Sequence, residues 1–268
     1  MSSTTADPTA RTDNPVLTDI TDGIARIRLN RPYARNAVNL ALCHALRRTF
    51  EDLDGDPRVR VVLLSGEGSA FCAGADLKER VDKDERWVRQ RRLASFAAYE
   101  AIERCSKPVV ASTHGAVVGS GGEIAMACDF ILADRDTTFR FPEPHWGTVG
   151  ATQRLQRVIG KRRAKELLFT NRLLGAPEAY TLGLVTRLVE PGELPAFTDE
   201  VCRSIAAAPA LAIELTKQAI DLGEESDLDR GIRIEMAAIE RCLADGGWRE
   251  GVTRFTNTSH SAPEGERP

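Results

Sequence analysis

The sequence has 268 residues, of which 42% are hydrophobic and 28% charged, and its formal net charge is −3. This fits one large globular domain or a domain with a helical extension. The acidic balance argues against nucleic acid as the main partner. No apolar run reaches the roughly 18 residues that a membrane helix needs. Residues 1–14 are polar and lack the apolar segment of a secretory signal. We therefore expect a cytoplasmic protein with no membrane partner and a disordered tail over 1–14.

Cysteine and histidine, the usual ligands of transition metals, are scattered along the chain. The six cysteines form no CxxC pair, and the four histidines form no HExxH motif. Dispersed cysteines in apolar surroundings are typical of reduced core residues. We expect no metal site and no cofactor.

Strand and helix patterns alternate in chain order. Val16–Ile20 and Ile24–Leu29 predict a hairpin that turns at Asp22-Gly23. A β-α-β order of this kind indicates an α/β fold with buried strands. The later predicted elements are a helix over 39–53 with Asn39 as its N-cap, strands over 59–64, 108–112 and 130–133, a helix over 160–169 and a strand over 184–188.

The C-terminal part is predicted to be helical. Three helices are expected over 194–208, 211–222 and 228–243, and the last two carry apolar residues at helical spacing. Apolar helix faces must be buried against something. From the sequence alone, the covering surface is either the protein's own core or another subunit.

One glycine-rich stretch, Gly115 to Phe130, lies between two apolar strands. Four of its first eight residues are glycine, and a helix of small residues follows. Such a turn presents free backbone N–H groups and lets a ligand approach the chain closely. Glu123, one turn into this helix, is the stretch's first charge. It is either a partner of the helix dipole or a catalytic group.

A second small-residue loop, Ser65 to Lys78, follows the strand predicted over 59–64. Both loops leave equivalent ends of neighbouring strands, where ligands bind in open α/β sheets. Two loops that direct N–H groups at one point would form an oxyanion hole. A plain surface turn is the other interpretation of this segment.

With these features in order, the chain resembles the enoyl-CoA hydratase/isomerase (crotonase) superfamily over about residues 15–260. Each matching piece is short, but their order and spacing are specific to the superfamily. The pieces are Leu29-Asn30-Arg31-Pro32 with Asn36-Ala37, Phe71 to Lys78, Lys107 to Ala125, Phe141-Pro142-Glu143 and Thr152-Gln153-Arg154-Leu155.

The resemblance implies a crotonase-like spiral of ββα units over residues 15–200 and a C-terminal helical oligomerisation region over 201–268. It implies a homotrimer or a hexamer of two stacked trimers. It also implies an acyl-CoA thioester as substrate, with coenzyme A as part of that substrate rather than a cofactor. The thioester oxygen would lie between the backbone N–H groups of Ala75 and Ser120. Position 120 is usually glycine in this family, but a main-chain donor can come from serine as well.

The resemblance also assigns a catalytic pair. In hydratases of this family two glutamates flank the double bond, and they correspond to Glu123 and Glu143. Adding water to a conjugated thioester needs a base to activate the water at Cβ and an acid to protonate Cα. We assign Glu123 as the base and Glu143 as the acid, which predicts an enoyl-CoA hydratase. Taken singly, Glu123 could serve only the helix dipole and Glu143 only a surface loop.

The resemblance places coenzyme A along the first helical region and the loop over 73–78. Backbone groups near Ala34 and Ala73 would take the adenine, and Arg35 and Lys78 are candidates for the phosphates. The other predicted substrate-binding residues are Asp76, Leu77 and Trp146.

After Glu143 the chain departs from its family. The run Gly147 to Leu155 is about three residues shorter than usual and lacks a proline. We expect this loop to be drawn toward the next helix or to re-aim Glu143. Trp146 would narrow the acyl pocket or form its apolar wall. His145 would bond Glu143 or face solvent.

Other functions fit parts of the pattern. Within the superfamily, an enoyl-CoA isomerase or another acyl-CoA lyase or hydrolase is the main alternative. Clp-type serine peptidases share the implied fold, so Ser120 with His145 could form a Ser–His–Asp hydrolase. A catalytically silent CoA-binding protein is a third possibility.

Overall fold

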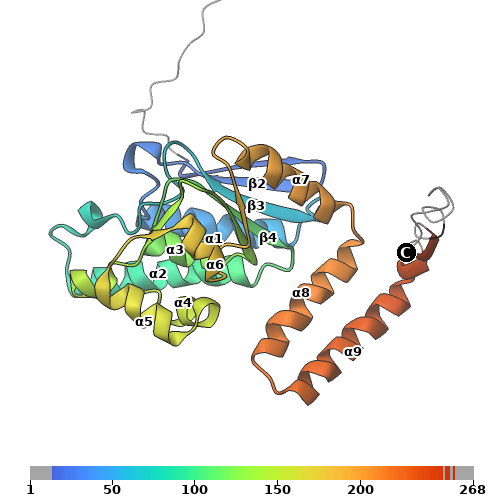
Figure 1. Cartoon of the computed structure of the whole chain (residues 1–268). Helices are drawn as coiled ribbons and strands as arrows, with labels where there is room; N and C mark the ends of the chain where they lie inside the picture. Colours follow the sequence, from blue (N-terminus) through green and yellow to red (C-terminus); the bar gives the residue numbers. More distant parts are fainter. Residues whose placement is uncertain (1–13, 250, 254–255, 257–268) are drawn as a thin grey trace, which may run out of the picture. The chain divides into compact units, whose positions relative to one another are not determined.

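The computed structural model describes residues 14–249, 251–253 and 256 (Figure 1). The tail predicted over 1–14 lies outside these residues except for Asn14. The described chain divides into two compact units, one up to Ala206 and one from Ala207. The boundary predicted after residue 200 therefore falls inside α7 (Leu194–Ala206), which belongs to the first unit.

The first unit is built on a six-stranded sheet with the order β1-β2-β3-β4-β6-β9. Its first two strands form the predicted antiparallel hairpin, and every later pairing is parallel. Asp22 and Gly23 both have positive φ (53° and 79°), the conformation that a two-residue hairpin turn requires. The strands are β1 (Val16–Thr21), β2 (Ile24–Leu29), β3 (Val61–Gly66), β4 (Val109–Thr113), β6 (Phe130–Asp134) and β9 (Arg187–Val189).

Helices cover both faces of this sheet (Figure 1). On one face α1 (Leu40–Asp54) and α2 (Glu85–Glu103) pack together over the larger apolar core. On the other face α7 contacts β2, β3, β4 and β6 over a smaller core that includes Leu63, Val110 and Leu132. Strands buried on both sides explain the near-continuous apolar runs in the sequence.

The helix α1 forms as its sequence predicts. The Asn39 side chain accepts a hydrogen bond from the backbone N–H of Leu42 (2.9 Å) and so caps the helix. Leu46 and Phe50, at helical spacing, are fully buried against the sheet. Five cysteines are buried and Cys242 is half-buried, and all six are free thiols, as predicted.

A second, three-stranded sheet was not predicted. It has the order β5-β7-β8, with β5 (Ala116–Val118), β7 (Thr138–Arg140) and β8 (Leu174–Gly175). Strands of two or three residues carry no readable alternation, so the sequence gives no sign of them. This small sheet positions the glycine-rich stretch, because β5 runs directly into it. The remaining segments are η1 (Pro32–Ala34), η2 (Leu77–Arg80), α3 (Ser120–Met126), η3 (Glu143–Trp146), α4 (Thr152–Ile159), α5 (Lys161–Thr170) and α6 (Ala176–Thr181).

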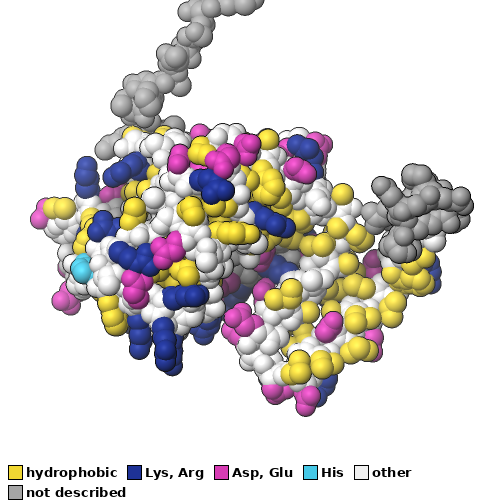
Figure 2. All heavy atoms as spheres, viewed as in Figure 1, with side chains coloured by type: hydrophobic (Ala, Val, Ile, Leu, Met, Phe, Trp, Pro, Cys, Tyr) yellow, Lys and Arg dark blue, Asp and Glu magenta, His cyan; other side chains and the backbone are white. Residues whose placement is uncertain are grey.

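In the second unit, α8 (Ala210–Glu224) and α9 (Leu228–Asp245) pack against each other. Asp227 caps α9 by accepting from the N–H of Arg230 (2.8 Å). Yellow apolar side chains follow these helices in Figure 2. None of the helices in the described residues is long and apolar enough to cross a membrane.

Candidate active site

The glycine-rich stretch makes a tight turn between β5 and α3. Gly119 has a positive φ of 46°, and a Cβ there would lie 2.4 Å from Oε1 of Glu143. A Cβ on Gly121 would lie 2.5 Å from the carbonyl oxygen of Cys72. Both positions therefore exclude a side chain, because one touches the second predicted glutamate and the other the neighbouring loop. The next residue after Gly119, Ser120, heads α3, so its N–H is one of those with no acceptor inside the helix.

The second loop runs beside the first. Cys72 pairs with Val117 of β5, and a Cβ on Gly74 would meet the carbonyl oxygen of Val118 at 2.9 Å. On its other side, Val38 bonds the carbonyl of Gly74 (2.7 Å) and the N–H of Asp76 (2.9 Å).

That pattern fixes the direction of the Ala75 N–H. In this parallel bridge, Val38 forms its hydrogen bonds with Gly74 and Asp76, the residues on either side of Ala75. The N–H of Ala75 therefore points away from Val38. It points toward the side on which β5 lies. The arrangement thus brings the loops of both predicted oxyanion donors, Ala75 and Ser120, together at one place.

Glu123 lies in the first turn of α3 and is 7% exposed. Its Oε1 accepts the backbone N–H of Ala151 (2.6 Å), and its Oε2 accepts from Nη1 of Arg154 (3.0 Å). The short run after Gly147 supplies both contacts, since Ala151 precedes α4 and Arg154 lies in its first turn. The shortened loop thus contacts Glu123 on α3, a contact that was not among the outcomes expected of it.

Arg154 belongs to the site, although no role was predicted for it from the sequence. Besides Glu123 it pairs with Glu103 at the end of α2 (2.7 Å), and its guanidinium lies over the ring of Tyr99 (5.6 Å to the centroid). Its position in the Thr-Gln-Arg-Leu match was the available signal. Charge and stacking together hold Arg154 at the back of the Glu123 carboxylate.

Glu143 has a different environment. It begins η3, and its side chain lies between Gly119 and Gly150, where a Cβ on Gly150 would be 2.6 Å from Cγ of Glu143. Its Oε2 is buried and has no hydrogen-bond partner among the described residues. Burial raises the pKa of Glu143, and the nearby charge of Glu123 adds to the increase, against smaller opposing effects of its own backbone and of Arg92. Such a group favours its protonated form.

Ser120 and His145 do not form the pair that a serine hydrolase needs. The Ser120 side chain hydrogen-bonds the phenol of Tyr99, whose pKa burial raises. The Nε2 of His145 lies 2.8 Å from the carbonyl oxygen of Phe169. Of the two expectations for His145, the exposed position is confirmed, while its ring contacts the Phe169 carbonyl on α5 rather than Glu143.

The residues expected to bind coenzyme A lie on two adjoining turns. The N–H of Ala73 donates to the carbonyl of Arg35 (2.9 Å), which joins the loop over 73–78 to η1, the turn that ends at Ala34. Leu77 and Lys78 are exposed on this loop.

Two other predicted substrate-binding residues, Asp76 and Trp146, have different surroundings. The carboxylate of Asp76 is paired with Arg31 (2.9 Å) and so braces the loop. Trp146 is 56% exposed, and its part in an acyl pocket stays a prediction.

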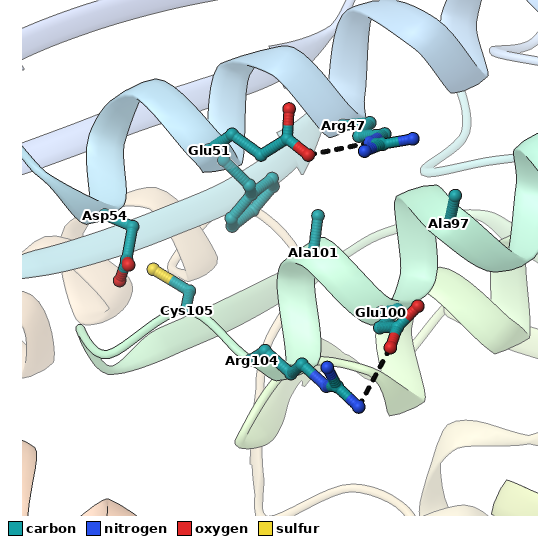
Figure 3. Close-up of a pocket in the computed structure, with 9 residues that line it drawn as sticks. Arg47, Glu51, Asp54, Ala97, Glu100, Ala101, Arg104 and Cys105 are labelled. Atoms are coloured by element: carbon teal, nitrogen blue, oxygen red, sulfur yellow. Dashed lines mark hydrogen bonds and ion pairs between the residues drawn. The ribbon is translucent and has the colours of Figure 1, made fainter.

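A separate groove lies between α1 and α2 (Figure 3). It has a volume of about 350 Å³, and its lining residues belong to these helices and to the segment just after α2. Its charges are paired across single helices, Arg47 with Glu51 (2.7 Å) and Arg104 with Glu100 (3.0 Å). The groove is distinct from the glutamate site. In the described residues, no three or more His, Cys, Asp or Glu side chains are grouped to hold a metal ion.

Comparison with known proteins agrees with this geometry. Residues 19–264 match the family described as enoyl-CoA hydratase/isomerase. The short-chain-enoyl-CoA hydratase of Clostridium acetobutylicum is 33% identical over 90% of this chain and 94% of its own. The crotonyl-CoA hydratase of Syntrophomonas wolfei is 34% identical over 87% of this chain and 91% of its own. The crystal structure of an enoyl-CoA hydratase from Bacillus anthracis superimposes with a TM-score of 0.88 at 34% identity, covering 91% of this chain and 96% of that one.

This chain belongs to the enoyl-CoA hydratase/isomerase family. The membership confirms the resemblance inferred from the motifs and, with it, the crotonase fold. Relatives named as hydratases also confirm the predicted enzyme class, hydro-lyase.

Proposed function

We propose that this protein is an enoyl-CoA hydratase that adds water across the α,β double bond of an acyl-CoA thioester. The observation that carries the proposal is the pair Glu123 and Glu143, which lie beside one oxyanion loop in opposite environments. Glu123 is surrounded by donors, one of them the cation Arg154. Glu143 is buried, with one oxygen lacking a donor among the described residues.

In the proposed reaction the carboxylate of Glu123 takes a proton from water as the oxygen bonds to Cβ. The electron pair of the double bond moves toward the thioester oxygen, and the N–H groups of Ala75 and Ser120 stabilise the negative charge there. Glu143 then gives its proton to Cα. The raised pKa of Glu143 suits this role, because an acid must be protonated before it can donate. Ala34, Arg35, Ala73 and Lys78 would hold the coenzyme A part.

The direct test is hydration of crotonyl-CoA, followed by loss of the enoyl-thioester absorbance. We expect turnover by the native chain and no labelling of Ser120 by a fluorophosphonate. An isomerase would instead shift the double bond of a 3-enoyl-CoA without adding water. A chain that binds crotonyl-CoA but leaves its absorbance unchanged would contradict the proposal.

We also propose that the active protein is a homo-oligomer, a trimer or hexamer, assembled through the second unit. One stripe of α9 is apolar and exposed, with Leu228, Ile232, Met236, Ile239 and Leu243 between 43% and 78% exposed. A second copy of the chain would bury this stripe. Light scattering should return three or six times the chain mass of 29.3 kDa, and a monomer mass would reject the idea.

A further inference from the structure

Arg91 is a buried cation whose hydrogen-bonding groups are mostly unused. It lies on the inner face of α2 and is 1% exposed. Its Nη2 donates to the carbonyl of Val38, but Nε and Nη1 have no hydrogen-bond partner in the described chain. The acid paired with it, Glu79, is 3.8 Å away and already accepts the N–H of Leu40 with both oxygens. A buried guanidinium with two idle donors is costly unless something else binds it.

Two more arginines, Arg80 and Arg92, lie near Arg91. The Nε of Arg80, on η2, is also buried and without a hydrogen-bond partner among the described residues. Burial lowers the pKa of Arg80, and the charges of Arg91 and Arg92 lower it further. The cluster Arg80, Arg91 and Arg92 thus holds three cations, and the acids near it are Glu79 and, beside Arg92, Glu143. A bound anion would offset the repulsion among these like charges.

The cluster borders the glutamate site. Nη2 of Arg92 donates to Oγ1 of Thr148 (2.8 Å), and the N–H of Thr148 donates to the carbonyl of Glu143 (3.0 Å). The charge of Arg92 also acts on the Glu143 carboxyl. Tyr99, whose phenol hydrogen-bonds Ser120, connects the cluster to the site on the other side. Its phenol interacts electrostatically with both Arg91 and Arg80.

We infer that the three arginines bind an anionic group on the acyl chain, so that the preferred substrate is an enoyl-CoA whose acyl part ends in a carboxylate. This inference rests on the proposed hydratase function and adds its substrate class. A carboxylate matches the planar donor geometry of a guanidinium and accepts from two donors at once. The link of Arg92 to Glu143 through Thr148 places the cluster near the reacting carbons, where the acyl chain lies.

The test compares glutaconyl-CoA with the analogue in which an isopropyl group of similar size replaces the carboxylate. We expect the native protein to hydrate glutaconyl-CoA with a kcat/KM at least about tenfold higher, the order expected for hydrogen bonds to a charged group. Arg80→Met and Arg92→Met should each reduce this preference about tenfold, and Arg80→Lys should keep part of it. These two positions are half-buried, whereas Arg91→Met could unfold the chain. Arg89→Met, an exposed change on the same helix, is the matched control and should keep the preference.

The outcomes separate the inference from the proposed function. A native preference near one, or a preference that Arg80→Met and Arg92→Met leave unchanged, overturns the inference while hydration of either ester upholds the function. If Arg80→Met and Arg92→Met weaken the binding of both thioesters and of free coenzyme A equally, the arginines bind the phosphates of coenzyme A. That result would also overturn the inference. If neither these thioesters nor crotonyl-CoA are hydrated, the function fails, and binding of the saturated thioesters decides the inference. The inference is supported if the native protein binds glutaryl-CoA more tightly than its isopropyl analogue and Arg80→Met loses this difference. Equal binding of the two by the native protein overturns the inference.

Discussion

Two regions of the site hold the same side chain in different ways. On α3, the carboxylate of Glu123 receives two hydrogen bonds, from the Ala151 backbone and from Arg154. On η3, the carboxyl of Glu143 is wedged between two glycines with a buried oxygen that has no donor in the described residues. Donors and a nearby cation stabilise a carboxylate, whereas burial without donors favours the neutral acid. The difference teaches that two residues of one type can be suited to the proposed roles of base and acid by their surroundings alone.

The largest expected effect comes from removing either carboxyl. Glu123→Gln and Glu143→Gln should each lower kcat by roughly 10²-fold or more with little change in KM, because proton transfer is lost while binding remains. Steady-state hydration of crotonyl-CoA measures both. Glu103→Gln is a suitable control, since Glu103 pairs with the same arginine from the exposed side. A glutamine variant that keeps more than about a tenth of the activity would remove that residue from the mechanism.

A smaller effect should follow from changing the cation behind Glu123. Arg154→Met should lower kcat/KM about tenfold, because the Glu123 carboxylate loses a charged hydrogen-bond donor that holds it in place. Steady-state hydration of crotonyl-CoA measures the change. Arg154→Lys keeps the charge and should restore part of the activity.

The variant Glu103→Gln is the control for this experiment. It removes the exposed partner of Arg154 but keeps the hydrogen bond from Arg154 to Glu123, so kcat/KM should change little. If Arg154→Met keeps the native kcat/KM, the cation behind Glu123 has no part in catalysis.

The sequence predicted most of the fold because its main signals are local. Asn39 with the apolar spacing of α1, and the apolar runs of β3 and β4, each specify an element without help from distant residues. The boundaries of the elements were predicted less accurately, since the strand expected over 59–64 is observed as Val61–Gly66. The short strands of the second sheet form only through pairing with segments far along the chain, which no local pattern records.

The predicted site was readable only in its motif residues. The glycines, Glu123 and Glu143 stand in recognisable runs, and the structure brings them together. The contacts of Arg154 and Tyr99 depend on how α2 and α4 pack, so spacing could not reveal them. Arg91 was detectable in principle, because a charged residue stands in register with Ser95 and Ile102 on the buried face of α2.

The buried carboxyl of Glu143 also predicts that stability depends on pH. The folded state raises the pKa of Glu143 above its unfolded value, so folding is penalised as pH rises through the folded pKa and Glu143 ionises. Glu143→Gln, which cannot ionise, should therefore raise the Tm at pH near 8. The gain should vanish near pH 4, close to the ordinary glutamate pKa of about 4.3, where the native carboxyl is already neutral. Thermal unfolding at both pH values measures this, and an equal change at both would contradict it.

The smallest expected effect concerns the backbone donor on the Glu123 side. Ala151 is 1% exposed and has φ 55°, a left-handed conformation that costs a residue with a Cβ roughly 1–2 kcal/mol. Ala151→Gly would relieve that strain, but it would lose a buried methyl, worth about 0.8 kcal/mol, and add about 0.4–1 kcal/mol of unfolded-chain entropy. These contributions nearly cancel, so its free energy of unfolding should stay within about 0.5 kcal/mol of the native value. The N–H to Glu123 is kept, so kcat should change little.

Ala164→Gly is the matched control. Ala164 is 2% exposed in the regular helix α5, where glycine relieves no strain and should cost about 1–2 kcal/mol. Urea unfolding of both variants decides the matter, and equal destabilisation would show that the tight loop before α4 holds its donor toward Glu123 without backbone strain.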